Sequence, residues 1–228
     1  MSENMVNLNK IIPRVLPFAA YIVFLALSDY ISPLLESVGI DSKWLYAIKI
    51  ILVIVLLMYF WRNYYELSVR PLVKELCYGA IAGLLVFLVW ILPYPAWAIL
   101  GSDVSGFNPN GDSNVIESFL WLSIRILGAA LIVPVMEELF WRSFVMRWID
   151  DKEFLGLSPE NISFYALIVS SGLFGLEHQL WLAGLFAGLV YGMLYKVYKN
   201  LWVPICAHAV TNGILGLWVM ITGNWQYW

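Results

Sequence analysis

The chain has 228 residues, of which 61% are hydrophobic and only 13% are charged, and its net charge at pH 7 is −3. A soluble domain is ordinarily about half apolar and about a quarter charged. A chain with so few charges cannot cover a surface that faces water, so membrane lipid is its expected surroundings. The slightly negative net charge also argues against nucleic acid as a partner.

Apolar runs of about 20 residues are long enough to cross a hydrocarbon core of about 30 Å. Seven such runs are predicted, at 15–35, 44–61, 77–100, 118–136, 162–178, 181–198 and 200–222. An eighth crossing follows if 137–149 also enters the membrane, and Gly101–Glu117 is expected to be a connecting loop. No linker divides the chain, so we predict one integral membrane domain over 1–228. Its expected fold class is all-α, a polytopic transmembrane helical bundle of seven to eight helices.

The distribution of basic residues predicts the orientation of the bundle. With a cytoplasmic N-terminus and seven alternating helices, the outer side holds only Lys43, while Lys49 and Arg125 lie within helices. Cytoplasmic segments of membrane proteins carry an excess of Lys and Arg. The sequence therefore predicts a multi-pass protein of the cell membrane with a cytoplasmic N-terminus. The inner side then holds the other ten of the 13 basic residues: Lys10, Arg14, Arg62, Arg70, Lys74, Arg142, Arg147, Lys152, Lys196 and Lys199.

Several polar side chains interrupt the apolar sequence of the second half. An ionisable group at the bilayer centre costs roughly 2.5–3.5 kcal/mol on insertion scales, so each one needs a reason. Both histidines of the protein belong to this set. This concentration predicts a functional site. The clusters are Glu137-Glu138 with Arg142, Glu177-His178, His208, and Asn212.

The first cluster separates two neighbouring acids. Glu138 and Arg142 are four residues apart, so they can pair on one helical face with the acid in the favourable N-terminal position. Glu137 is rotated by about 100° from Glu138 and lies outside that pair. The spacing predicts a structural Glu138 and a Glu137 that is free to accept or donate a proton. The alternative is that both glutamates solvate a helix end near the cytoplasmic face.

The remaining clusters supply two imidazoles and a carboxamide. Phe174 lies one turn before His178 and could pack on its ring, while His208 and Asn212 share one face of an apolar helix. Exposure of these polar side chains to lipid would cost free energy, so they should point into the interior of the bundle. Each can equally serve as a hydrogen-bonding contact between helices. Together, however, a carboxylate, two imidazoles and an amide donor are the groups that attack of water on a peptide bond requires.

Three motifs carry a resemblance to a known family. Glu137-Glu138-Leu-Phe-Trp-Arg142 fits EExxxR, Phe174-Gly-Leu-Glu-His178 fits FxxxH, and His208-Ala-Val-Thr-Asn212 fits HxxxN. In this order, on successive apolar segments, they resemble the motifs of the CPBP family, which includes the type II CAAX prenyl endopeptidases. The resemblance covers 118–215 and identifies this region as the motif-bearing core.

The resemblance implies an intramembrane endopeptidase that hydrolyses a peptide bond of a membrane-associated peptide or lipid-modified protein. Glu137 would act as general base on a water molecule, with help from His178. His208 and Asn212 would stabilise the oxyanion. The supporting positions would be Glu138, Arg142 and Phe174.

Zinc is the alternative to a metal-free site. The resemblance permits Glu137, His178 and His208 as ligands, with an open position for water. A metal-free site is favoured because Asn212 is a poor zinc ligand but a good oxyanion donor, and because the sequence contains no HExxH pair. No cofactor is therefore expected.

Strict alternation of seven helices raises a geometric problem. It places Glu137 at the inner end of its helix and His178 at the outer end of the next. The two can meet only if 162–178 is short and tilted, or if the chain re-enters the membrane after Pro134. Non-helical backbone at that depth must line a protein cavity. An internal polar cavity is therefore expected.

Two other functions compete with hydrolysis. The chain could be a non-catalytic scaffold or partner protein of the same fold, because function depends on the site rather than on the fold. It could also be a proton-coupled transporter that uses Glu137 and the histidines as a relay. Transporters usually contain internal repeats, and the two halves of this sequence show no such symmetry.

Overall fold

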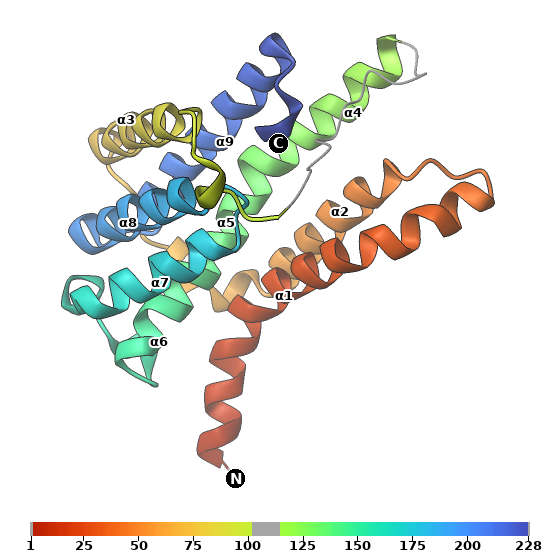
Figure 1. Cartoon of the computed structure of the whole chain (residues 1–228). Helices are drawn as coiled ribbons and strands as arrows, with labels where there is room; N and C mark the ends of the chain where they lie inside the picture. The colour runs from red at the N-terminus through yellow and green to blue at the C-terminus, as the bar shows by residue number, and fades with distance from the viewer. Residues whose placement is uncertain (1, 102–114, 228) are drawn as a thin grey trace.

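The computed structural model describes residues 2–101 and 115–227. Within these ranges the regular secondary structure is helical and contains no β-strand, which confirms the all-α fold class (Figure 1). Most of the predicted loop at Gly101–Glu117 lies outside the described residues.

The helices form seven segments within the described ranges. The α-helices are α1 (Ser2–Ser37), α2 (Trp44–Tyr59), α3 (Val73–Trp90), α4 (Val115–Leu127), α5 (Val133–Glu138), α6 (Met146–Asp150), α7 (Phe164–Leu176), α8 (Trp181–Tyr198) and α9 (Trp202–Thr222). Two π-helical stretches, η4 (Gly128–Ile132) and η5 (Leu139–Val145), join α4, α5 and α6. Short 3₁₀ helices are η1 (Trp61–Asn63), η2 (Tyr65–Leu67), η3 (Ala96–Ala98), η6 (Phe154–Gly156), η7 (Pro159–Asn161) and η8 (Trp225–Tyr227).

The segment from α4 to α6 differs from the prediction. The apolar run at 118–136 and the possible eighth crossing at 137–149 form one continuous helical segment that ends at Asp150. The chain therefore does not turn back after Pro134. The helix continues instead, and the π-helical stretches η4 and η5 are its only departures from α-helical geometry between α4 and α6. Glu137 lies inside this long segment rather than at a helix end. A π-helical stretch inside an α-helix often accompanies a functional site.

Five helices of the described part are long and apolar enough to span a membrane. They are Leu8–Ser37, Val73–Trp90, Phe119–Asp150, Trp181–Tyr198 and Trp202–Thr222, and α2 and α7 are shorter apolar helices. The predicted crossing at 77–100 ends early, at Trp90, because Pro93 and Pro95 lack the backbone N–H that a helix needs. This arrangement supports a multi-pass membrane protein.

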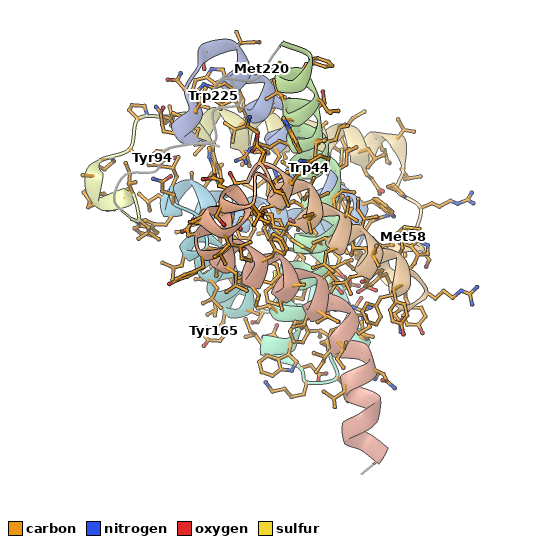
Figure 2. All side chains as sticks on the ribbon, turned by 90° about the vertical axis from the view of Figure 1, so that its right-hand side faces the viewer. Trp44, Met58, Tyr94, Tyr165, Met220 and Trp225 are labelled. Carbon is orange, nitrogen blue, oxygen red and sulfur yellow. The ribbon has the colours of Figure 1, made fainter. Side chains whose placement is uncertain are left out.

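Large apolar side chains cover the outside of the bundle (Figure 2). Met58, Tyr165, Trp44 and Met220 all project outward and are exposed. In water such a surface would expose far more apolar area than a soluble monomer shows. Lipid is the medium in which this surface is favourable.

Two helix pairs pack at unusually close range. A side chain at Gly83 on α3 would collide with the backbone of Ala207 on α9, and a Cβ at Gly175 on α7 would lie 2.7 Å from the carbonyl of Trp181 on α8. Helices in membranes associate largely through such small residues, because the hydrophobic effect does not drive the association of helices in lipid. These contacts hold α9, which carries His208, against α3, and α7, which ends two residues before His178, against α8.

The segments predicted to lie at the cytoplasmic side meet at one end of the bundle. Lys10 pairs with Glu153 at 2.6 Å, and Trp202 Nε1 donates to the carbonyl of Leu67 at 2.9 Å. Lys199 pairs with Glu160 at 3.0 Å. The start of α1, the α2–α3 connection, the α6–α7 connection and the α8–α9 connection therefore lie together.

Not all of the predicted inner basic residues lie at this surface. Arg142 is 2% exposed and pairs with Glu138 inside the bundle. Arg147 is also buried, and its guanidinium donates to the carbonyls of Leu155 and Leu157.

Arg14 on α1 forms the strongest polar contact at this end. Its guanidinium donates to both carboxylate oxygens of Glu66, at 2.8 and 2.6 Å, and to the carbonyls of Lys10 and Asn63. The hydroxyl of Ser143 in η5 also donates to Glu66. A bidentate charge-assisted pair of this kind is strong and geometrically specific. It connects α1 to the segment that carries Glu137.

This contact predicts a dependence of stability on pH. Burial raises the pKa of Glu66, but the hydrogen bonds and charge of Arg14, with the Ser143 hydrogen bond, outweigh burial and hold the pKa below 4.5. A carboxylate with a lowered folded-state pKa stabilises the fold above its unfolded-state pKa, and that contribution is lost as the pH falls through the folded-state value. We therefore expect the thermal stability of the detergent-solubilised protein to fall below pH ~4.5.

The variant Glu66→Gln should be less stable than wild type at pH 7 and should lose less stability on acidification. The matched control is Glu153→Gln, because Glu153 pairs with Lys10 at the exposed surface. Equal acid dependence of wild type and Glu66→Gln in thermal unfolding from pH 7 to pH 3 would contradict this account.

Candidate active site

A polar cavity of about 210 Å³ lies inside the bundle. All four residues predicted to be catalytic line it, although they come from three separate helical segments. The sequence analysis expected such an internal polar cavity, and the structure contains one. The polar and aromatic lining residues are Tyr21, Tyr46, Trp90, Arg125, Glu137, Phe174, His178, Tyr191, His208, Thr211, Asn212 and Tyr227.

Glu137 is the acid that faces this cavity. It is 5% exposed, and its Oε2 accepts no hydrogen bond from the described residues. Oε2 lies 3.8 Å from Nε2 of His208, which is too far for a direct hydrogen bond. At such a separation a bridging water is the expected link between polar atoms. As the sequence predicted, Glu137 lies outside the neighbouring ion pair.

Glu138 lies between an imidazole and a guanidinium. Its Oε1 accepts a hydrogen bond from Nδ1 of His208 at 2.9 Å, and its Oε2 lies 3.1 Å from Nε of Arg142. The ion pair that the spacing of Glu138 and Arg142 predicts is therefore present. The contact with His208 was not predicted, because it joins residues 70 positions apart in the chain. Glu138 fixes the ring of His208 so that Nε2 points towards Glu137.

Arg142 is held by aromatic rings as well as by Glu138. Its guanidinium carbon lies 4.5 Å from the ring centroid of Phe174 and 5.5 Å from that of Tyr191. Cations interact favourably with the faces of aromatic rings, and more strongly when both are removed from water. The resulting cluster places one positive charge next to the two buried acids, Glu137 and Glu138.

His178 lies two residues after the end of α7 and is oriented by a backbone carbonyl of that helix. Its Nδ1 lies 2.7 Å from the carbonyl oxygen of Phe174. Because a carbonyl oxygen only accepts, Nδ1 carries the proton and Nε2 of the neutral ring is an acceptor. The rings of Phe174 and His178 are 4.6 Å apart, as the one-turn spacing suggested, and Trp90 contacts the imidazole from α3 at 5.3 Å.

The short helix α7 resolves the expected conflict between Glu137 and His178. With 13 residues, α7 ends before it could cross a bilayer, so His178 lies inside the bundle. Of the two solutions considered, the short helix is therefore correct and re-entry after Pro134 is wrong. The turn after α7 is supported by Leu100, whose N–H donates to the carbonyl of Gln179 at 2.8 Å.

Asn212 is bound to the π-helical stretch η4. Its Nδ2 donates to the carbonyl of Ala129 at 2.9 Å. A π-helical stretch shifts the backbone hydrogen-bonding pattern and can free a carbonyl for such a contact. The carboxamide nitrogen has two N–H groups, so one remains available while the other is held.

Tyr191 and Thr211 form a second layer that the sequence analysis missed. The ring of Tyr191 stacks on His208 with centroids 5.0 Å apart, and its hydroxyl donates to Thr211 Oγ1 at 2.7 Å. The hydroxyl of Thr211 donates in turn to the carbonyl of Gly83. Tyr191 belongs to none of the motifs in the sequence. Only the packing of the helices reveals that its ring contacts His208.

Arg125 is a further lining residue that the sequence analysis did not select. It is a charged residue in an apolar helix. The cost of inserting a charge into the membrane, which selected Glu137, could therefore have selected Arg125 as well. Tyr21, Tyr46 and Trp90 also line the cavity but look like ordinary apolar-helix residues in the sequence.

The fit of the proposed zinc ligands can be tested on their donor atoms. Nδ1 of His208 is engaged by Glu138, and Nδ1 of His178 is engaged by the Phe174 carbonyl. Among the residues of 2–101 and 115–227, no group of three or more His, Cys, Asp or Glu side chains is arranged to hold a metal ion. These contacts leave Nε2 of both rings available, and a carboxylate or a carbonyl on the other ring nitrogen is also found at metal-ligating histidines.

The fold and the cavity define a multi-pass helical membrane protein with a buried carboxylate–imidazole site. Residues 119–214 match the family described as "Type II CAAX prenyl endopeptidase Rce1-like". The chain is also 26% identical over 140 residues to the Bacillus subtilis (strain 168) protein "Putative membrane peptidase YdiL". That match covers 58% of this chain and 52% of the relative, so the chain spans about half the length of the curated relative. No solved structure matches the chain.

The matched interval contains all three motifs and every one of the four proposed catalytic residues. These two matches agree with the family resemblance that the three motifs carry. The match ends near the end of the cavity-lining part of α9, and the first three helices lie outside it.

The pairing of Glu138 with Arg142 and His208 predicts a large effect of Glu138→Gln on stability. Removing one partner leaves a buried charge uncompensated, which costs about 3–5 kcal/mol. We expect a clear fall in the free energy of unfolding in detergent. The matched control is Glu160→Gln, whose partner Lys199 is exposed, and it should leave stability nearly unchanged. Similar stability of the two variants would disprove the structural role of Glu138.

Proposed function

We propose that the chain is an intramembrane endopeptidase that uses Glu137 to activate water. The single observation that carries this proposal is the buried Glu137 Oε2, which accepts no hydrogen bond from the described residues and faces His208 across 3.8 Å inside a polar cavity. A carboxylate in that position is within reach of a bound water on one side and of an imidazole on the other. The match of residues 119–214 to the endopeptidase family supports the same class of reaction.

The first step is attack by water. Glu137, helped by Nε2 of His178, takes one proton from the water as its oxygen forms a bond to the scissile carbonyl carbon. The carbonyl oxygen becomes an oxyanion, which Nε2–H of His208 and the free N–H of Asn212 bind. Because Nδ1 of His208 already donates to Glu138, an Nε2–H exists only in the doubly protonated ring, so the proposal requires a His208 that is protonated before the reaction and balanced by the Glu138 carboxylate. Donors held in place before the reaction avoid a reorganisation cost in the transition state.

The second step breaks the C–N bond. The proton held by Glu137 is transferred to the leaving nitrogen, the oxyanion re-forms a carbonyl, and the products are a carboxylic acid and an amine. Arg142 keeps the two acids in place. The walls of Trp90, Phe174 and Tyr191 limit the entry of further water, which strengthens the electrostatic interactions inside.

The proposed substrate is a peptide or a lipid-modified protein at the membrane. A site enclosed by helices is reached by a substrate that is itself associated with the bilayer. We further propose that the N-terminus is cytoplasmic, because the basic residues Lys10, Lys196 and Lys199 gather at the end of the bundle that contains the start of α1.

Loss of the general base should stop cleavage without unfolding the protein. We expect Glu137→Gln and His178→Ala to lower the rate by about 10²–10⁴-fold. The measurement compares protein termini in membranes of a host that expresses wild type with those of a host that expresses each variant. New termini should appear only with wild type. Glu153→Gln is the matched control, because Glu153 lies at the exposed end of the bundle, and it should cleave like wild type.

The same experiment distinguishes hydrolysis from the alternatives. A scaffold or a transporter would produce no wild-type-dependent termini. If Glu137→Gln produces as many new termini as wild type, the general-base role is wrong. Thermal unfolding in detergent confirms that each variant is folded.

The metal-free mechanism predicts resistance to chelators. We expect purified protein treated with phenanthroline to retain its cleavage rate, because the proposed steps use only side chains and water. The control is a zinc peptidase treated in parallel. Loss of activity that added zinc restores would favour the metal-dependent alternative.

A further inference from the structure

Glu177 is an acidic residue of the polar clusters that the proposed mechanism does not use. It directly precedes His178, and in FxxxH it occupies one of the positions that the motif leaves open. Its side chain is half-buried immediately after the last residue of α7. A carboxylate in so apolar a region costs free energy to insert into a membrane, so its presence needs a reason.

The indole of Trp141 binds the carboxylate of Glu177. Trp141 Nε1 donates to Glu177 Oε2 at 3.1 Å, between residues 36 positions apart. Trp141 is 7% exposed, and a buried indole N–H usually has a hydrogen-bond partner. Its ring packs edge-to-face against Phe174, with centroids 6.0 Å apart, and against Phe18 at 5.8 Å. Packing therefore fixes the indole, and the indole in turn fixes the carboxylate.

This hydrogen bond joins the two segments that carry Glu137 and His178. Trp141 follows Glu137 by four residues in the continuous helical segment from α4 to α6, whereas Glu177 adjoins His178. The hydrogen bond between His178 and the carbonyl of Phe174 orients the imidazole relative to α7. It does not fix the imidazole relative to Glu137, because both of its partners belong to the end of α7. The contact between Trp141 and Glu177 supplies that second constraint.

α7 makes another polar contact with the same segment at its opposite end. The carboxylate of Asp150, the last residue of α6, accepts hydrogen bonds from the backbone N–H and the hydroxyl of Ser163 at 2.6 and 2.7 Å. α6 and α7 lie side by side (Figure 1). Each end of α7 is thus hydrogen-bonded to the segment that contains Glu137, but only the contact at Glu177 adjoins a residue of the cavity.

Close packing restricts His178 on its other sides. A Cβ added at Gly184 on α8 would lie 3.2 Å from the Cβ of His178, and the ring of Trp90 on α3 lies 5.3 Å from the imidazole. These contacts limit movement towards α8 and α3. The hydrogen bond from Trp141 limits movement away from the segment of Glu137.

We propose that Glu177 is a positioning residue, which through its hydrogen bond with Trp141 places His178 for its part in activating water. This inference rests on the proposed endopeptidase function, because the role of His178 is taken from it. The negative charge of Glu177 also acts on Arg142 and Glu137. The experiment therefore has to separate the hydrogen bond from the charge.

The first measurement observes the imidazole itself. The chain has two histidines, so a full chain that is isotope-labelled at histidine Cε1 gives two ring signals in an NMR spectrum in detergent. His178→Ala assigns them. Glu177→Ala and Trp141→Phe should each shift or broaden the His178 signal and leave the His208 signal in place. Glu177→Gln should keep both signals at their wild-type positions, because its amide oxygen still accepts from the indole.

The second measurement is the rate at which wild-type-dependent termini appear in membranes. Misplacement of a catalytic group by about 1 Å can cost ~10²-fold in rate, so Glu177→Ala and Trp141→Phe should each slow cleavage by about 10- to 100-fold. Both variants break the same hydrogen bond, so the double variant should be hardly slower than either one. Glu177→Gln should cleave at close to the wild-type rate, because it keeps the acceptor and loses only the charge.

Asp150→Ala is the matched control, because it breaks the hydrogen bonds at the other end of α7. It should lower the thermal stability in detergent, but it should change neither the His178 signal nor the cleavage rate. Thermal unfolding of every variant shows that folded proteins are compared.

Three results would overturn the inference. The first is a Glu177→Ala protein with the wild-type His178 signal and the wild-type rate. The second is a Glu177→Gln protein that cleaves as slowly as Glu177→Ala, which would assign the effect to charge. The third is equal slowing by Asp150→Ala, which would mean a general structural role.

The two proposals fail in different ways. If Glu137→Gln stops cleavage while Glu177→Ala behaves like wild type, the positioning role alone is wrong and the endopeptidase proposal stands. If wild type produces no new termini, the endopeptidase proposal is wrong, and the role of Glu177 in catalysis falls with it.

Discussion

The arrangement of the whole site depends on how Glu138 is neutralised. A carboxylate with no exposed surface inside a lipid-embedded bundle is tolerated only when opposite charges or hydrogen-bond donors surround it. Glu138 finds both, because Arg142 lies one turn later in the same segment and His208 approaches from α9. Satisfying this one acid fixes the distance between two helices. It also sets the direction of the His208 ring and therefore the surroundings of Glu137.

Irregular helix geometry and small residues then make the polar cavity compatible with lipid. The π-helical stretches η4 and η5 flank the short helix that bears Glu137, and the first supplies the carbonyl that holds Asn212. Close packing at Gly83 holds α9 against α3, and close packing at Gly175 holds α7 against α8. The site is thus a consequence of how the helices can pack.

The sequence by itself determined the helical class, the membrane environment and the candidate residues, because insertion costs and i,i+4 spacing act locally along one helix. The pair between Glu138 and Arg142 is of this kind. Only the tertiary structure decided that α7 is short enough for His178 to line the same cavity as Glu137, and that Glu138 also binds His208. Contacts between residues 70 positions apart depend on helix packing, and no periodicity within one segment encodes them.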